Sequence, residues 1–289
     1  MLSFLTTERL DISDAVLAQA TNTLSGTPSG EAGGDAAALV RASYFEALNA
    51  LQAVALPLPQ TSRPDVRLRK QDHLADGLLS VFHLKSNWPD EATADELYET
   101  MAFIEAAFEQ LESADASCGG TFSSLVSHRI AVAVFAADFS GGGMSEAHNL
   151  GLVCFGMGSR WPDMAAHFAE TFIHEAVHQA LFLEDMLHRV FKDEARARLS
   201  DRPLEAYSTT RATNRPYDVA FHAACVTSTL AEYRRCVRPT ASPAQDASHV
   251  QRELQRSVRD LEQLREQALT SDGNRILDEL IRMTSAIPS

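Results

Sequence analysis

The chain has 289 residues, 45% of them hydrophobic and 22% charged, which is ordinary globular composition with enough length for one large core or two smaller ones. Its formal net charge of −14 repels phosphate backbones, so nucleic acid is not an expected partner. No apolar run is long enough to cross a bilayer, and the acidic N-terminal stretch lacks a signal-peptide pattern, so no membrane partner is expected either.

The cysteines give an expected redox state and location. There are four, at Cys118, Cys154, Cys225 and Cys236, and none belongs to a C-x-x-C pair. This spacing indicates scattered thiols rather than a disulfide framework. We therefore expect a cytoplasmic protein with reduced cysteines.

The first third of the chain is predicted to be helical. Residues 35–55 are rich in Ala and Leu and open at an Asp that is suited to capping a helix. Further helices are predicted for residues 71–84 and 93–112. Thr93 and Glu96 form a capping-box pattern at the start of the last of these helices.

The residue pattern of the sequence changes near residues 118–120, from helical periodicity to short apolar runs. This change marks a candidate boundary between an N-terminal helical region, residues 1–118, and a metal-binding catalytic region with C-terminal helices, residues 119–289. The two regions could also share one continuous domain.

Two short apolar runs follow that boundary. Residues 128–139 and 148–157 are apolar and partly β-branched, and the Gly-rich stretch 140–147 between them is predicted to be a turn. Together they predict an antiparallel hairpin just before the next helix. A strand in such a position can pair with an extended peptide.

The next predicted helix begins near Trp161 and contains the H-E-x-x-H string from His174 to His178. Two histidines four residues apart lie on one face of a helix, so both can bind the same metal ion. Glu175, the candidate catalytic residue, can reach a metal-bound water or support the ligands from behind. Because two side chains do not make a stable metal site, a third ligand is required.

The best candidate for the third ligand is His222. It lies on a helix predicted for residues 217–235, and its neighbours Phe221, Ala223 and Ala224 are apolar, so its side chain is expected to face inward. Asp218 lies one turn earlier on the same face. It could replace His222 as the ligand or orient it.

Residues 199–217, which precede that helix, are predicted to be a loop that carries Arg211 and Arg215. A guanidinium close to a metal is costly unless an anion pairs with it. The fork of an arginine fits a carboxylate through two parallel hydrogen bonds, as an oxo-acid co-substrate would require. The alternative is that both arginines are simply solvated.

The C-terminal part is predicted to hold two more helices, at residues 248–269 and 274–283, the first of them amphipathic. That helix is expected to pack on the core or to form a homo-oligomer contact. The expected fold class is therefore α+β and mostly α, with a zincin-like metal helix, a small antiparallel sheet, and additional N- and C-terminal helices.

The string HEAVHQALF, followed by YSTTRATNRPYDVAFHAACVTSTLAEYRR, resembles the α-ketoglutarate-dependent HExxH-type peptide β-hydroxylases. The similar region runs from Phe168 to Arg235, less than a third of the chain. The H-E-x-x-H part is shared with many zinc peptidases, whereas the R-x-x-x-R-P segment and the inward histidine distinguish this family.

The resemblance implies an Fe(II)/2-oxoglutarate-dependent oxygenase that hydroxylates a β carbon in a peptide or amino acid, typically in a ribosomal precursor peptide. His174, His178 and His222 would hold the iron, and 2-oxoglutarate would chelate it with Arg211 or Arg215 on the far carboxylate. Non-haem oxygenases more often use two histidines and one carboxylate, an arrangement that Asp218 or Glu175 would restore.

Two other interpretations remain open. In a zinc metallopeptidase, Glu175 would be the general base and the strand predicted near Asn149 to Phe155 would bind the peptide. Three side chains could then stabilise the oxyanion, namely His128, His148 and Tyr207. The extended metzincin pattern is excluded because Leu181 and Glu184 stand where it needs Gly and His. A structural metal site or a binding module without chemistry is the third interpretation.

Overall fold

The computed structural model describes residues 1–6, 10, 44–50, 52, 55–58, 61, 63–68, 75, 77–78, 94–136, 143–156, 162–237 and 244–286. The chain divides into two compact units. The helical unit comprises Met1–Thr6, Ala114–Gly120 and Ala180–Ser289, and the sheet unit comprises Thr7–Ser113 and Thr121–Gln179. Both units take residues from either side of residue 118, so they do not follow the single cut considered from the sequence.

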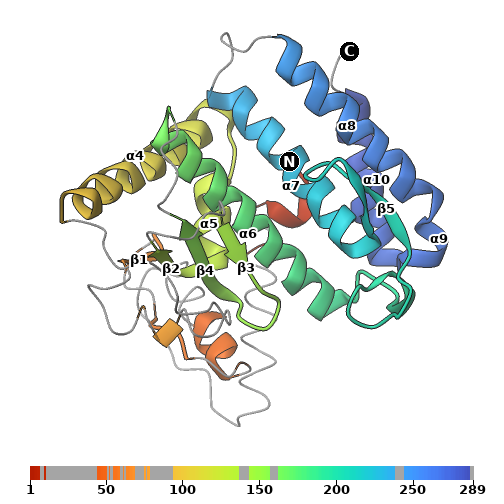
Figure 1. Cartoon of the computed structure of the whole chain (residues 1–289), viewed down its shortest axis with the longest axis horizontal. Coiled ribbons are helices and arrows are strands. Elements are labelled where there is room, and N and C mark those ends of the chain that lie inside the picture. The colour runs from red at the N-terminus through yellow and green to blue at the C-terminus, as the bar shows by residue number, and fades with distance from the viewer. Residues whose placement is uncertain are drawn as a thin grey trace. The chain divides into compact units, whose positions relative to one another are not determined.

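The sheet unit contains a four-stranded sheet. Its elements are β1 (Asp65–Leu68), most of α4 (Ala94–Cys118), α5 (Phe122–Arg129), β2 (Ile130–Ala136), β3 (Gly143–Ser145), β4 (Gly151–Gly156) and the first part of α6 (Met164–His188). The strand order is β1-β2-β4-β3. β1, β2 and β4 run parallel, β3 runs antiparallel to β4, and α6 lies along β3 and β4 (Figure 1).

The predicted hairpin between residues 128–139 and 148–157 is wrong. β2 and β4 pair in parallel, with Phe135 opposite Phe155. All seven residues of β2 are buried, which is typical of a parallel strand covered on both faces and which the missing polar alternation could have indicated. Part of the expected turn forms β3, and the antiparallel hairpin in this region joins β3 to β4.

Aromatic side chains form the core of the sheet unit between the sheet and the helices. The ring of Phe172 on α6 lies 4.8 Å from that of Phe155 and 4.9 Å from that of Phe108 on α4, measured between centroids. Phe168, one turn earlier on α6, meets the edge of Phe135 at 5.3 Å. These contacts fix which face of α6 points toward the sheet.

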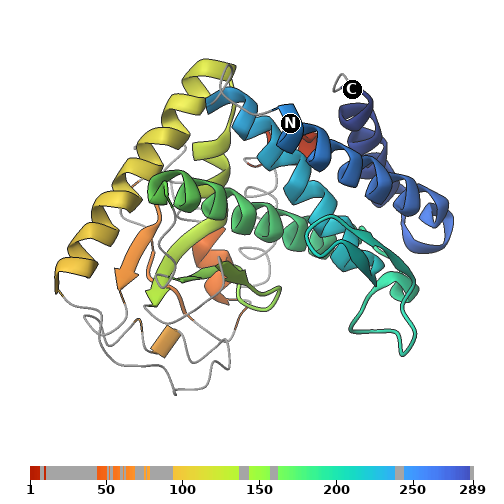
Figure 2. The same ribbon diagram turned by 45° about the horizontal axis from the view of Figure 1, so that its top comes forward.

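The helical unit is built from short helices, a two-stranded sheet and three long helices. Its elements are η1 (Ser3–Leu5), η3 (Asp193–Ala195), β5 (Glu205–Ser208), β6 (Thr213–Pro216), α7 (Tyr217–Val237), α8 (Ala244–Gln263), α9 (Arg265–Ala268) and α10 (Ser271–Ala286). α7, α8 and α10 pack side by side, and β5 lies against α7 and α8 (Figure 2). This unit also contains the last residues of α4 and of α6.

Several sequence predictions are confirmed and one more is corrected. The described residues are mostly helical with a small antiparallel sheet, β5–β6, and additional helices. The helix predicted for residues 217–235 is α7. The stretch 199–217 is not only a loop, because the short mixed-polarity strands β5 and β6 pair within it.

Most of the predicted helices at residues 35–55 and 71–84 lie outside the described residues, as does Thr93 with its capping pattern. Within them, residues 44–50 form a helix and residues 75, 77 and 78 are helical. In the described part of the chain, no helix combines the length and the apolarity that crossing a bilayer demands.

The prediction that all four cysteines are thiols is wrong. Cys118, at the end of α4, and Cys236 on α7 form a disulfide, with their Cα atoms 5.8 Å apart. The partners are 118 residues apart in sequence, so no local spacing could reveal the pair. Cys154 and Cys225 are buried free thiols, as expected. The expected cytoplasmic location relied on reduced cysteines and stays a prediction.

Candidate metal centre

α6 carries two adjacent polar rows. His174 and His178 form one row, four residues apart. Thr171, Glu175 and Gln179 form the other row, also at four-residue spacing, which places them on a neighbouring face of the helix. The imidazoles of the first row are half-buried, and the second row faces the strands β3 and β4.

The two imidazoles of the first row converge. The Nε2 atoms of His174 and His178 are 3.1 Å apart. Two nitrogens bound to one first-row metal ion, each at about 2.1 Å, lie about 3 Å apart, so this pair fits a metal ion. Burial lowers the pKa of His174 to about 4, which keeps its ring neutral at pH 7, the form that binds metals.

Glu175 lies beside this pair but belongs to the second row. Its Oε1 atom is 3.9 Å from Nε2 of His174, and the residue is 2% exposed. Burial raises the pKa of the Glu175 carboxyl to about 7, although Ser145 donates a hydrogen bond to it. The carboxyl is therefore enclosed against β3 rather than open to solvent.

Gln179 continues the second row and binds the start of β4. Its Oε1 atom accepts a hydrogen bond of 2.9 Å from the backbone N–H of Gly151, and its Nε2 atom donates one of 3.3 Å to the carbonyl of Leu152. Sequence reasoning missed Gln179, and also Gly143 and Ser145 on β3. The four-residue spacing from Glu175 could have indicated Gln179, but no local pattern indicates the two β3 residues.

His222 is buried on α7, as the sequence predicted, and it lies in the helical unit. Its ring is 5.0 Å from that of Phe182 and 6.0 Å from that of Phe191, measured between centroids. Burial lowers the pKa of His222 to about 4, so it too is a neutral imidazole at pH 7. Because His174 and His178 belong to the sheet unit, the role of His222 as their third ligand stays a prediction.

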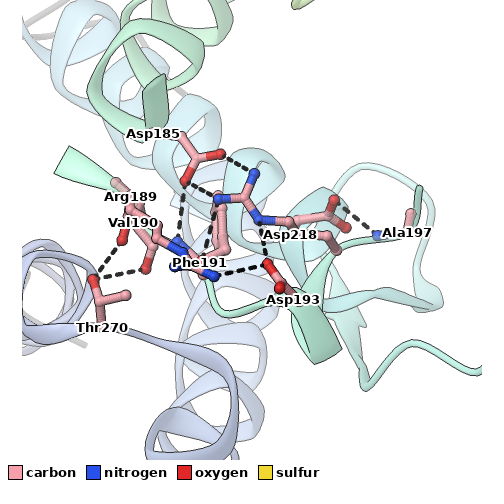
Figure 3. Close-up of polar contacts among 9 residues, drawn as sticks. Asp185, Arg189, Val190, Phe191, Asp193, Ala197, Asp218 and Thr270 are labelled. Atoms are coloured by element: carbon pink, nitrogen blue, oxygen red, sulfur yellow. Dashed lines mark hydrogen bonds and ion pairs between the residues drawn. The ribbon is translucent and has the colours of Figure 1, made fainter. Parts of the chain in front are cut away.

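A bidentate ion pair holds the segment that follows α6. Arg196 donates to both carboxylate oxygens of Asp185, at 2.6 and 2.9 Å. Asp185 also accepts a hydrogen bond of 3.1 Å from the backbone N–H of Phe191 (Figure 3). The pair therefore fixes the backbone at Phe191, whose ring covers His222.

Asp218, the alternative third ligand, is engaged with backbone donors. Its Oδ2 atom accepts a hydrogen bond of 3.1 Å from the N–H of Ala197 (Figure 3), and its Oδ1 atom accepts one of 2.8 Å from the N–H of Val219. Burial raises the pKa of its carboxyl. The bond from Ala197 joins the start of α7 to the segment after η3, which gives Asp218 a structural role.

The two candidate co-substrate arginines lie on the β5–β6 hairpin. Arg211 lies in its turn and Arg215 on β6, and both are exposed. Neither guanidinium forms an ion pair or a hydrogen bond with another residue in the described part of the chain. β6 runs directly into α7, so the same hairpin leads to the helix that holds His222.

The three side chains considered for a peptidase oxyanion differ in their surroundings. Tyr207 is buried on β5, donates its hydroxyl hydrogen bond to Glu253, and has the guanidinium of Arg256 3.8 Å above its ring centre. His128 is buried in α5, and His148 is exposed before β4. Tyr207 is therefore already committed to a structural contact.

Within the described residues, no group of three or more His, Cys, Asp or Glu side chains is arranged so that it could bind a metal ion. No protein-family model matches the chain, and a comparison with curated proteins gives no significant match.

Proposed function

We propose that this protein is an Fe(II)/2-oxoglutarate-dependent oxygenase that hydroxylates a β carbon of an amino-acid residue in a peptide. The expected substrate is a ribosomal precursor peptide. The observation that carries the proposal is the convergence of two imidazoles, those of His174 and His178, at 3.1 Å on one face of α6. The resemblance of the HExxH and R-x-x-x-R-P segments supplies the choice of chemistry.

In this proposal His174, His178 and His222 hold the metal. Iron with 2-oxoglutarate and oxygen would supply the oxidising power to replace a C–H bond by C–OH. Burial lowers the pKa of His174 and of His222 to about 4, so these two imidazoles are unprotonated at pH 7. Neutral nitrogens are the form that coordinates a metal without first releasing a proton.

Arg211 and Arg215 are proposed to bind the far carboxylate of 2-oxoglutarate. Support comes from their exposure and from the absence of another ion pair for either among the described residues. Such a guanidinium can form two parallel hydrogen bonds to a carboxylate.

The peptide is proposed to bind beside β3. β3 is the last strand of the described sheet, and it pairs with β4 on one side only. The backbone groups on the other side of such an edge can pair with an extended chain. Since β3 lies against Glu175, next to His174, a peptide added there would place its side chains close to the imidazole pair.

A zinc metallopeptidase is the second candidate, and one observation favours it. Glu175 is 3.9 Å from His174, and its pKa is raised to about 7, which suits a general base at neutral pH. The strand expected from the sequence to hold the peptide, β4, is paired on both sides, so the edge strand β3 would hold the peptide to be cleaved instead. The two candidates differ in metal, in co-substrate and in their need for oxygen.

The experiment that tests the proposal measures succinate formed from 2-oxoglutarate by the purified protein with Fe(II), with and without oxygen. The oxygenase requires both, whereas a peptidase cleaves peptides with zinc whether or not oxygen is present. Cleavage with zinc and no succinate under any condition would reject the oxygenase.

Variants of the hairpin sharpen this test. Arg215→Ala or Arg211→Ala should weaken the binding of 2-oxoglutarate about tenfold or more, because a charge-assisted bidentate contact is lost. Iron binding should not change. Arg282→Ala, which removes another exposed arginine on α10, is the matched control. Equal 2-oxoglutarate affinity in all three variants would remove both arginines from the proposed site.

A further inference from the structure

β3 touches α6 through two of its three residues. Gly143 and Ser145 lie on the same side of the strand because side chains alternate, and Met144 lies on the other side. Ser145 donates a hydrogen bond to the Glu175 carboxyl. Gly143 lies directly over the same carboxyl, so both contacts converge on Glu175.

The approach at Gly143 leaves no space for a side chain. A Cβ atom there would lie 2.6 Å from Oε1 and 2.9 Å from Cγ of Glu175, and 2.9 Å from Cγ2 of Thr171. Real Cβ atoms do not come so close, so the backbone of β3 lies in van der Waals contact with the Glu175 side chain. Glycine is required here for close approach, not for an unusual backbone conformation.

Few other contacts within the described part of the chain hold β3 in place. It contains three residues and pairs with one neighbour, and a strand so short is marginally stable without packing against another element. On α6, β3 packs against the side chains of Glu175 and Thr171. The position of this edge therefore depends strongly on one buried carboxyl.

We infer that Glu175 is a positioning residue whose carboxyl, through the Ser145 hydroxyl and the bare backbone of Gly143, fixes the edge strand β3 next to the imidazole pair. This contact sets the depth at which a peptide paired with β3 would lie beside His174. The peptide's part in the inference rests on the proposed function. The contact between Glu175 and β3 does not, because it requires neither metal nor substrate.

A positioning role and a general-base role differ in what glutamine can replace. The amide oxygen of Glu175→Gln can accept the Ser145 hydrogen bond and fill the same space, so the contact with β3 is kept. The same amide cannot take a proton from water. Glu175→Ala removes the contact altogether, and Ser145→Ala removes its hydrogen bond only.

The first test uses the metal-free protein and amide hydrogen exchange of residues 143–145. Glu175→Ala and Ser145→Ala should accelerate exchange there by about tenfold or more, since each loses a hydrogen bond to a buried carboxyl. Glu175→Gln should exchange within about threefold of wild type. Met144→Ala, on the opposite side of β3, is the control, and its exchange rates at residues 143–145 should also stay within about threefold of wild type.

Cobalt(II), added alone, reports on the imidazole pair in the same proteins. Its affinity should change less than about threefold in Ser145→Ala, because the Ser145 hydroxyl bonds to Glu175, which is not one of the proposed metal ligands. Unchanged exchange of β3 in both Glu175→Ala and Ser145→Ala would overturn the inference. Exchange in Glu175→Gln as fast as in Glu175→Ala would overturn it too.

The second test uses a peptide that the wild-type protein hydroxylates. Ser145→Ala should raise KM for the peptide about fivefold or more and leave peptide-independent succinate formation within about twofold. Glu175→Gln should keep KM for the peptide within about twofold of wild type, because the amide keeps the contact with β3. A loss of about a hundredfold in Glu175→Gln with β3 still protected would identify Glu175 as a proton acceptor and overturn the positioning role. If wild type forms no succinate, the proposed function fails, whereas the exchange result still decides the contact.

Discussion

The two compact units of this chain differ most in charge. The sheet unit carries 22 acidic and 9 basic residues, whereas the helical unit carries 17 acidic and 16 basic residues. Almost the whole net charge of −14 therefore belongs to the unit that holds the imidazole pair and the edge strand. A strongly negative surface attracts cations and basic peptides and repels acidic ones. We therefore expect the peptide partner to be basic near the residue that reacts.

The units also differ in how they are stabilised. The sheet unit has a cluster of aromatic rings between β2, β4, α4 and α6, and the helical unit has the disulfide between α4 and α7. The polar rows of α6 are therefore supported by an apolar core, whereas the helix that carries His222 is held in part by the Cys118–Cys236 disulfide. Four changes test this contrast.

The largest effect is expected from removing the disulfide. Because Cys118 and Cys236 are 118 residues apart, loop closure in the unfolded chain predicts a loss of about 4–5 kcal/mol in the free energy of unfolding for Cys118→Ser with Cys236→Ser. Denaturant unfolding measures it. Two reactive thiols are expected in the unfolded, unreduced protein, and four would show that the disulfide is absent.

Phe172→Ala should have the next largest effect, on the sheet unit. Its ring packs against Phe108 and Phe155 and is fully buried, so truncation should cost about 3–5 kcal/mol. Denaturant unfolding gives the value, and hydrogen exchange shows where it is lost. Exchange that rises in α7 and α8 but not in β2 and β4 would contradict the separation into two units.

His174→Ala should weaken the binding of Fe(II) or cobalt(II) by at least about a hundredfold, since even the loss of a residue supporting a ligand costs about 10- to 100-fold. His178→Ala should do the same. His167→Ala, on the same helix but outside the pair, is the control and should leave the affinity unchanged. Metal binding that survives either ligand substitution would show that the converging imidazoles are a structural feature only.

The smallest effect is expected from Arg63→Ala. Arg63 is partly exposed and pairs with Glu105 and Glu112 on α4 at 2.7 and 2.8 Å. Such pairs contribute about 0.2–1 kcal/mol each at low ionic strength, and the loss should shrink as salt is added. Thermal unfolding at two salt concentrations measures it. A loss that does not depend on salt would mean that the contact of Arg63 with the Phe108 ring dominates instead.

Local patterns predicted the two long helices α6 and α7 but not the short helix α5. The helix with the H-E-x-x-H string and the helix with His222 were predicted because periodicity, apolar neighbours and the nearby prolines lie within a few residues of one another. The inward orientation of His222 followed from its apolar neighbours and is confirmed by its contacts with Phe182 and Phe191.

Features that join distant residues were not predicted. The parallel pairing of β2 with β4, the disulfide and the division into two discontinuous units all depend on residues far apart in sequence. The contacts of Gly143 and Ser145 with Glu175 belong to the same class, because a three-residue strand in a Gly-rich stretch has the local pattern of a turn. The four-residue spacing in the sequence indicates the two polar rows of α6. It does not indicate which strands or helices each row contacts.

The most direct test of the proposed chemistry is an anaerobic titration of the Fe(II)-loaded protein with 2-oxoglutarate, followed by visible absorption. A keto acid that chelates Fe(II) produces a charge-transfer band, so we predict a band that saturates at one equivalent and weakens in His174→Ala and in Arg215→Ala. If the Fe(II) protein develops no band while the zinc form cleaves a peptide without oxygen, the oxygenase is contradicted and the peptidase takes its place.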